Sequence, residues 1–317
     1  MPKSTKTGKE MVQTTKLDER ERRAGDSLNT ALQKNIILAA APPYGGKTFS
    51  VVKLIQRGEK LGFNVVLLDR DAAVVETLRE VRGNKPAPSN LEYFRVDNWD
   101  RIDDGVAYTI KNLKAGDWCV VEQMGFIWDL VQSEYSRRVY GGRSRHELAM
   151  RAVAEEMIAA ADVSLNSSNA TERAKAKSIL QQQMGFGGIN SDGWSLIKRM
   201  YNDDFSVKLR IGGEYNILFT TSLVPMSDRD KLDARLTAFH KSPNRPEGDR
   251  DFVHAVNTVM VLSTGRDGIH SWRTLLPGGT GKDRGRELMR DVSFEGVGLV
   301  SSYYKAHGLD LTPPKEG

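Results

Sequence analysis

The sequence has one cysteine, few histidines and no long hydrophobic run. Cys119 alone excludes an intramolecular disulfide framework and favours a reducing compartment. The five histidines are scattered, without a pair at metal-ligand spacing, which argues against zinc chemistry. No apolar run reaches the roughly 18 residues that suggest a membrane span, and the charged N-terminus lacks the apolar segment of a signal peptide. We therefore expect a cytoplasmic protein without a membrane association.

Positive charge exceeds negative charge, with a formal net charge of +5 over 317 residues. Residues 1–23 hold seven Lys/Arg against four Asp/Glu, and residues 265–290 hold six against three. Such an excess permits an anionic macromolecular partner such as a nucleic acid. It is equally compatible with a solvated surface, so both interpretations stay open here.

Apolar runs and helical patterns alternate along the first part of the chain. A helical pattern follows each of the first three runs and ends near residues 60, 81 and 114. This alternation predicts an α/β fold with a mainly parallel central sheet flanked by helices. The C-terminal part should add two more strands and an antiparallel β-hairpin strand after the turn at residues 265–268. The strands are expected at about residues 35–40, 63–68, 91–96, 118–121, 215–221, 256–262 and 271–276.

The chain divides into one large domain with two tails. Residues 1–30 are basic and polar and are expected to be a partly disordered tail, and residues 301–317 are expected to be a C-terminal tail. The domain at 31–300 includes a helical insertion at about 145–190, with a capping box from Asn169 to Glu172. A longer helix after it carries an apolar stripe that we interpret as core packing: Trp194, Ile197, Tyr201, Phe205 and Leu209.

A phosphate-binding loop is the most informative motif. An apolar strand leads into a small-residue loop, and Lys47 and Thr48 then open a helix. Such a loop cradles a polyphosphate with backbone N–H groups at a helix N-terminus, while the lysine reaches the terminal phosphates and the threonine hydroxyl binds Mg²⁺. The match lacks only its first glycine, which is Ala41 here. We therefore predict ATP and Mg²⁺ as cofactors, bound by Ala41, Pro42, Pro43, Tyr44, Gly45, Gly46, Lys47, Thr48 and Phe49.

Polar residues at the ends of the predicted strands supply the remaining chemistry. Glu122 follows a buried apolar run and is predicted to hold the Mg²⁺ hydration shell with Thr48. Asp71 is our candidate for activating a water molecule, with Asp69 in reserve. Thr221, with Thr220 beside it, is placed to sense the γ-phosphate. Each position also has a purely structural interpretation. Glu122 could simply cap a strand, Asp71 could belong to a solvated acidic turn, and Thr221 could be an ordinary residue at a strand end.

A second glycine-rich segment, residues 278–286, carries Lys282 and Arg284. It is not a phosphate-binding loop, because no buried strand leads into it and no Ser or Thr follows the lysine. A loop of this kind is suited to present cations to the nucleotide of a neighbouring subunit. A plain surface loop is the alternative.

Taken together, these motifs resemble those of the RecA-like P-loop ATPases, and in particular short phage-encoded members associated with recombination and replication. The resemblance spans about residues 35–290 and rests on motif order. Its segments are 41–48, 67–71, 120–122 followed by 127–132, 192–202 before 216–221, and Lys282 to Arg284. Within that family, Asp71 stands near the position of a catalytic glutamate, Glu122 replaces an aspartate, and Lys282 and Arg284 lie where finger residues occur.

The resemblance implies an ATPase that engages single-stranded DNA as a homo-oligomer, either a ring or a filament, in the host cytoplasm if the protein is phage-encoded. Alternatives remain open. A DNA-packaging ATPase would carry a following nuclease domain, a small-molecule phosphotransferase would use the insertion as a lid, and a nucleotide-gated scaffold would bind without turnover. DNA-stimulated release of ADP separates the first function from the others.

Overall fold

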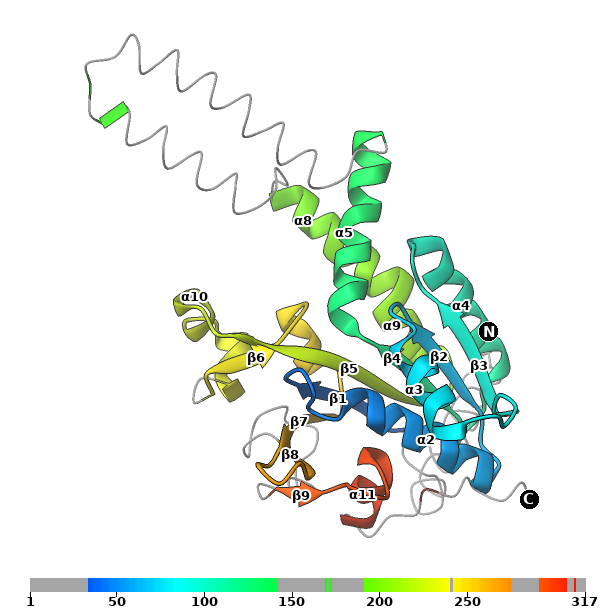
Figure 1. Cartoon of the computed structure of the whole chain (residues 1–317). Helices are drawn as coiled ribbons and strands as arrows, with labels where there is room; N and C mark the ends of the chain where they lie inside the picture. The colour runs from blue at the N-terminus through cyan, green and yellow to red at the C-terminus, as the bar shows by residue number, and fades with distance from the viewer. Residues whose placement is uncertain are drawn as a thin grey trace, which may run out of the picture.

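A computed structural model describes residues 34–141, 169, 171–172, 191–239, 242–274, 291–306 and 311. Within these residues a nine-stranded sheet has the order β3-β2-β4-β5-β1-β7-β8-β9, and β6 pairs with β5 (Figure 1). The strands are β1 (Ile36–Ala41), β2 (Val65–Asp69), β3 (Leu91–Arg95), β4 (Trp118–Glu122), β5 (Asn216–Pro225), β6 (Asn244–Pro246), β7 (Thr258–Thr264), β8 (His270–Thr274) and β9 (Val292–Ser293).

The strands from β3 to β7 in this order run parallel, and the sheet edge beyond β7 is antiparallel. The central strands β1, β2 and β4 are buried along nearly their whole length, as expected when helices cover both faces. The hairpin of β7 and β8 pairs Thr264 with His270 across its turn. The expected α/β class, with its mainly parallel sheet and C-terminal hairpin, is therefore confirmed.

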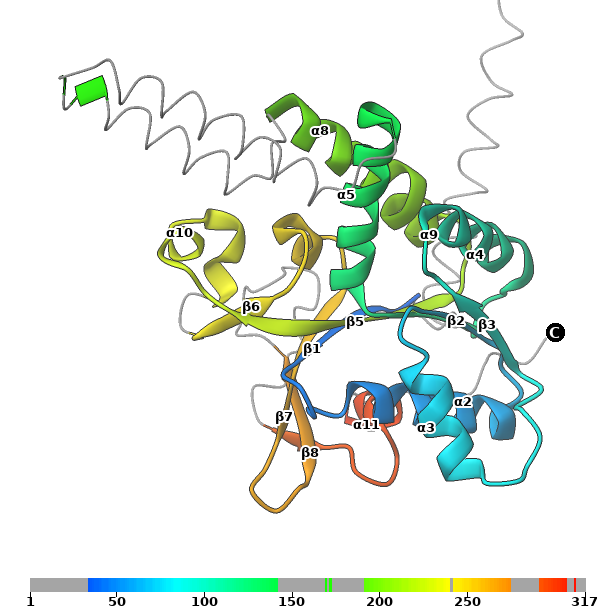
Figure 2. The ribbon, with the colours of Figure 1, turned by 45° about the horizontal axis from the view of Figure 1, so that its top comes forward.

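Helices form a layer on each face of the sheet (Figure 2). One layer contains α2 (Lys47–Leu61), α3 (Ala73–Arg82) and α11 (Leu299–Ala306). The other contains α4 (Trp99–Asn112), α5 (Met124–Tyr140), α8 (Ser191–Met200) and α9 (Val207–Ile211). Each layer buries its own apolar cluster against the sheet. Because the helices cover the faces of the sheet, the loops at the strand ends remain available to form a site.

The aromatic stripe after the insertion packs in the core, as predicted. Tyr201 and Phe205 are buried in a π-helical segment, η1 (Tyr201–Ser206), that joins α8 to α9. Apolar residues spaced four apart drift around an α-helix, and the wider turn of a π-helix offsets that drift. Ile197 and Leu209 complete the buried face on either side.

The tail expected from residue 301 instead begins inside a helix, because residues 301–306 belong to α11 (Leu299–Ala306). Tyr303 and Tyr304 are fully buried, and the Tyr304 hydroxyl accepts a hydrogen bond of 2.8 Å from the side-chain amide of Asn35. The apolar face of α11 packs with α2, which keeps this end of the chain in the domain.

Short elements connect β5 to β7. They are α10 (Asp228–Lys231), η2 (Ala234–Phe239) and η3 (Arg250–His254). Asp230 is buried there and pairs with Arg245 at 3.1 Å and Arg250 at 2.6 Å. Burial raises the pKa of this carboxyl, but hydrogen bonds from Ser227 and Arg245 outweigh that effect and hold the pKa at about 2.

Most of the predicted insertion lies outside the described residues, as does the N-terminal tail at 1–30. Asn169 is described, and its side chain accepts a hydrogen bond of 3.0 Å from the N–H of Thr171. Among the helices that the structure describes, none is long and apolar enough to cross a membrane.

Candidate nucleotide-binding site

The candidate site lies where the carboxyl ends of β1, β2 and β4 meet beside the middle of β5. The loop that follows β1 ends at Lys47, the first residue of α2. On the neighbouring strands, Asp69 at the end of β2 stands opposite Glu122 at the end of β4. In β5, Thr221 stands opposite Ala40 of β1. Parallel register therefore brings the predicted loop, both carboxylates and both threonines to one edge of the sheet.

The loop has the backbone shape that a helix N-terminal anion site needs. Gly46 caps α2 in the left-handed conformation, with φ of 86°, which glycine adopts without strain. A Cβ on Gly45 would lie 2.7 Å from the Cβ of Ala41. Ala41 is therefore tolerated in place of glycine because its partner across the loop is itself a glycine. Tyr44 projects from the tip and is 94% exposed.

Lys47 points back along the loop rather than into solvent. Its Nζ donates to the carbonyl oxygens of Ala41 at 3.1 Å and Pro42 at 3.3 Å. Burial lowers the pKa of the ammonium group, while the carboxylates of Glu122 and Glu247 act in the opposite direction. The lysine is thus a partly buried cation that already lies between the loop and two carboxylates.

Glu122 is the most perturbed carboxylate of the site. It is only 8% exposed, and burial raises its pKa to about 7. Hydrogen bonds from Thr220 and Thr48 and the charge of Lys47 lower the pKa, whereas the nearby Asp69 raises it further. A carboxyl that titrates near neutral pH beside a loop lysine is typical of a functional site.

Asp69 and Asp71 have different surroundings although they are two residues apart. Asp69 is fully buried, burial raises its pKa, and its Oδ1 accepts a hydrogen bond of 3.0 Å from the N–H of Asp71. Its Oδ2 is buried without a hydrogen bond to the described residues. Asp71 lies just before α3 and is exposed. The buried Asp69 is therefore suited to the interior of the site, and the exposed Asp71 is suited to contact with water.

These side chains fit a magnesium ion. The Thr48 hydroxyl and the Glu122 carboxylate contact each other, and the buried Asp69 carboxylate is beside them. Magnesium prefers such hard oxygen ligands and keeps several of its waters. The buried Oδ2 of Asp69 supplies an acceptor for one of those waters.

The two threonines of β5 have separate partners. The hydroxyl of Thr220 donates to Oε2 of Glu122 at 2.5 Å. The hydroxyl of Thr221, our predicted sensor, instead donates to the backbone oxygen of Glu247 at 3.0 Å. Successive strand residues point to opposite faces, so only one of the pair contacts Glu122. The structure therefore brings Thr220, which we predicted only as a neighbour, into the carboxylate cluster.

Three residues near the loop were absent from the sequence analysis. Glu247 is exposed, and its carboxylate lies 2.6 Å from the position of a Cβ on Gly125. His270 stacks on Phe294 with ring centroids 5.6 Å apart, and both rings pack against Gly46. The predicted hairpin was the one sequence signal for His270, which begins β8 and pairs with Thr264 of β7, the strand next to β1. Lys282 and Arg284 lie outside the described residues.

No family model and no curated protein matches the chain. Among solved structures, a KaiC-like protein from the hyperthermophilic archaeon Pyrococcus horikoshii is similar over 83% of this chain and 85% of its own. The two sequences are 12% identical and the TM-score is 0.34.

Proposed function

We propose that this protein binds Mg·ATP at the loop of residues 41–48, hydrolyses it, and uses the cycle to act on single-stranded DNA. One observation carries the nucleotide part. Thr48, at the start of α2, contacts the buried Glu122, whose neighbours are Lys47 and Asp69. A helix N-terminus, a cation and a carboxylate pair converge at one point, as phosphoryl transfer requires.

Each side chain has a distinct role in this proposal. Lys47 exchanges its contacts with the loop carbonyls for the terminal phosphates. Thr48 and Glu122 would hold Mg²⁺, which neutralises phosphate charge when it is bound. Thr220 positions Glu122 through its hydrogen bond. Ionisation of Glu122 is coupled to metal binding, because a carboxyl with a pKa of about 7 loses its proton when a cation arrives.

Hydrolysis adds a water molecule to the γ-phosphorus and breaks its bond to the bridging oxygen, which releases ADP and phosphate. A carboxylate then accepts the proton of the attacking water. We assign this role to Asp71, which is exposed to water near the end of β2. Thr221 remains a candidate to contact the γ-phosphate, next to the exposed Glu247.

DNA is proposed as the partner on two grounds. The chain resembles phage recombination and replication ATPases, and it carries a net charge of +5. Homo-oligomerisation would bring Lys282 and Arg284 of one subunit to the nucleotide of the next. The buried, unpaired Cys119 is compatible with the cytoplasm in which such a protein would work.

The test is ATP hydrolysis by the purified protein, with and without single-stranded DNA at low salt. We expect Mg²⁺-dependent turnover that DNA accelerates, and the acceleration should fade as salt rises because phosphate contacts release counterions. Transfer of phosphate to a small acceptor without any effect of DNA would refute the proposal.

A nucleotide-gated scaffold is the second candidate, and one observation favours it. Glu122 is buried, with a pKa of about 7, so a substantial fraction is protonated at neutral pH. A protonated carboxyl binds metal weakly, which slows turnover without preventing nucleotide binding. Tight Mg·ATP binding with no release of ADP, with or without DNA, would select this alternative.

A further inference from the structure

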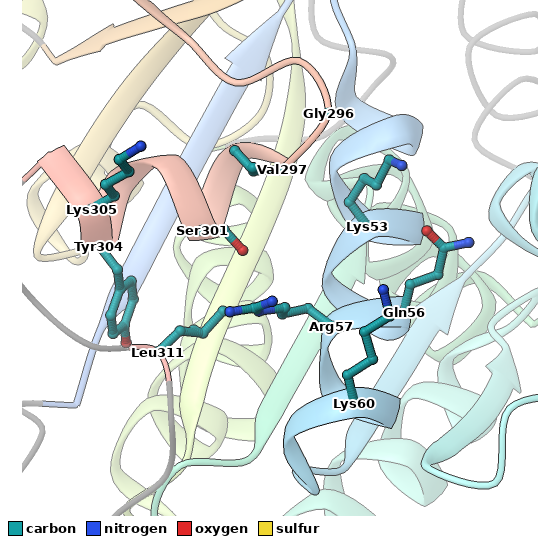
Figure 3. Close-up of a pocket in the computed structure, with 10 residues that line it drawn as sticks. All are labelled: Lys53, Gln56, Arg57, Lys60, Gly296, Val297, Ser301, Tyr304, Lys305 and Leu311. Atoms are coloured by element: carbon teal, nitrogen blue, oxygen red, sulfur yellow. The ribbon is translucent and has the colours of Figure 1, made fainter.

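A cavity lies between α2 and α11 (Figure 3). Its volume is about 360 Å³. Three of its cationic side chains come from one face of α2, at positions i, i+4 and i+7, and a fourth cation projects from α11. The four cations are Lys53, Arg57, Lys60 and Lys305, which we call the basic cleft.

No acidic residue lines the basic cleft among the described residues. The structure also gives its four cations no ion pair within the part of the chain that it describes. Glu59, the acid next to Lys60, is engaged by Arg82 at 2.6 Å. Cations on a protein surface usually alternate with acids, so four that line one cleft without a counter-charge indicate an anionic ligand.

The walls of the cleft are fixed by close packing. Gly298, just before α11, has φ of 83°, and a Cβ at this position would lie 2.5 Å from the Cβ of Lys53. Lys53 itself lies over the Phe49 ring, 5.2 Å from its centroid. Tyr304 is 2% exposed and its hydroxyl is bonded to Asn35. Packing therefore fixes the position of Lys53 in the cleft, and the buried ring of Tyr304 is not available to stack on a base.

The spacing of the charges favours a chain of phosphates over a single phosphate. Lys53 and Lys60 are seven residues apart, which separates them by about 10 Å along α2. Such a row suits successive phosphates of a strand that runs along the helix. Because cations contact the backbone and no exposed ring meets a base, binding should be strongly salt-dependent and indifferent to sequence.

We propose that the basic cleft binds the phosphate backbone of single-stranded DNA. This inference rests on the proposed function for its partner and adds the surface that contacts it. The same helix carries Lys47 and Thr48 at its first turn and the cleft cations further along, so α2 links the two sites as one rigid element. Along the helix, Lys53 lies about 9 Å from Lys47 and Lys60 lies about 20 Å from it, so the cleft begins next to the nucleotide site and extends away from it.

The test uses the full-length protein and a fluorescein-labelled dT20 oligonucleotide in an anisotropy titration. The test variant is Arg57→Gln/Lys60→Gln/Lys305→Gln, which leaves Lys53 in place. The matched control, Lys85→Gln/Lys111→Gln/Arg199→Gln, removes the same charge from three exposed cations elsewhere. We expect the test variant to lose on the order of 10- to 100-fold in affinity at low salt, and the slope of log affinity against log salt to fall by about 2. The control should bind nearly as the wild type does.

Hydrolysis of ATP without DNA is measured on the same three proteins and should be equal. If all three bind dT20 alike while they hydrolyse ATP, the cleft inference is wrong and the ATPase proposal stands. If the test variant alone loses dT20 and no protein hydrolyses ATP, the cleft inference stands and the ATPase proposal fails. Wild-type protein that ignores dT20 but binds vesicles with anionic lipids through these residues would overturn the DNA assignment.

Discussion

The hydroxyl of Thr220 donates a 2.5 Å hydrogen bond to Oε2 of Glu122, which joins β5 to β4 at the edge of the candidate site. Because both residues are buried, this bond is not exchanged with bulk water. It orients the carboxylate toward Thr48 and favours its ionised form. Thr220 is thus a positioning residue for the proposed metal ligand.

Thr220→Val should therefore change the pH dependence of the site. Loss of the hydroxyl removes a stabilising contact to the carboxylate, so the pKa of Glu122 rises and the acidic limb of the pH–activity profile moves to higher pH. Thr220→Ser should restore the profile, because it keeps the donor. Thr221→Val is the matched control, since its hydroxyl contacts a backbone oxygen instead. An unshifted profile for Thr220→Val would contradict the positioning role.

Glu122→Gln should stabilise the nucleotide-free protein at alkaline pH. The pKa of Glu122 rises from 4.5 to about 7 on folding, so the folded state holds its proton more tightly than the unfolded chain does. The free energy of unfolding of the wild type should therefore fall as pH increases between these values, by on the order of 3 kcal/mol in all. Glutamine removes this loss.

Urea unfolding at pH 4.5 and pH 8 measures both proteins. We expect similar stability at the lower pH and a more stable variant at the higher pH. Parallel pH profiles for the two proteins would mean that Glu122 has an ordinary pKa. The unfolding measurements are made without Mg²⁺ and nucleotide, so they report on the empty site. A loss of turnover in the variant does not affect them.

Lys47→Ala should abolish turnover and leave the fold intact. Within the described residues its ammonium group donates hydrogen bonds to two loop carbonyls. Its charge also acts on the buried Glu122, which can take up a proton when that charge is lost, so the fold is kept. Loss of a cation at the transferred phosphate costs about 10² to 10³ in kcat. Steady-state release of phosphate checks the rate and circular dichroism checks the fold. Unchanged turnover would remove the argument for a phosphate-binding loop.

Local motifs determined which parts of this site were predictable. Lys47 and Thr48 could be located at the start of a helix because the strand, the loop and the helix follow one another directly in the sequence. The sequence could not show which of Thr220 and Thr221 contacts Glu122. Both faces of β5 are buried at this point, so no alternation of polar and apolar residues distinguishes them. His270 and Phe294 reach the loop only through long-range packing.

The C-terminal boundary was a different kind of error. Leu299, Val300, Tyr303 and Tyr304 have the spacing of an amphipathic helix, and all four are buried. The signal for α11 was therefore present in the sequence, but the helix is only eight residues long. Short helices of this kind gain their stability from packing, here against α2, and not from their own propensity.

Substitutions of Asp69, at the end of β2, and of Asp71, just after it, should have different effects. Asp71→Asn is expected to lower kcat by at least about 100-fold with little change in Mg·ATP affinity, because an exposed general base acts only in the chemical step. Asp69→Asn should instead lower the pKa of Glu122, since it removes a neighbouring negative charge. A Glu247→Gln variant is the necessary third arm, because that carboxylate also acts on Lys47. Full activity of Asp71→Asn with a loss in Glu247→Gln would transfer the role to Glu247.

Arg284→Ala should reduce hydrolysis only where subunits touch. In the proposed oligomer Arg284 acts on the nucleotide of a neighbour, so its loss disables the adjoining site and leaves its own loop intact. When the Arg284→Ala variant is mixed with the Lys47→Ala variant, some interfaces combine the intact Arg284 of one subunit with the intact Lys47 of the other. Each variant alone should be nearly inactive, and the mixture should recover part of the wild-type rate, up to about a quarter if subunits exchange at random in a dimeric unit. A mixture no faster than its two components would exclude an arginine that acts between subunits.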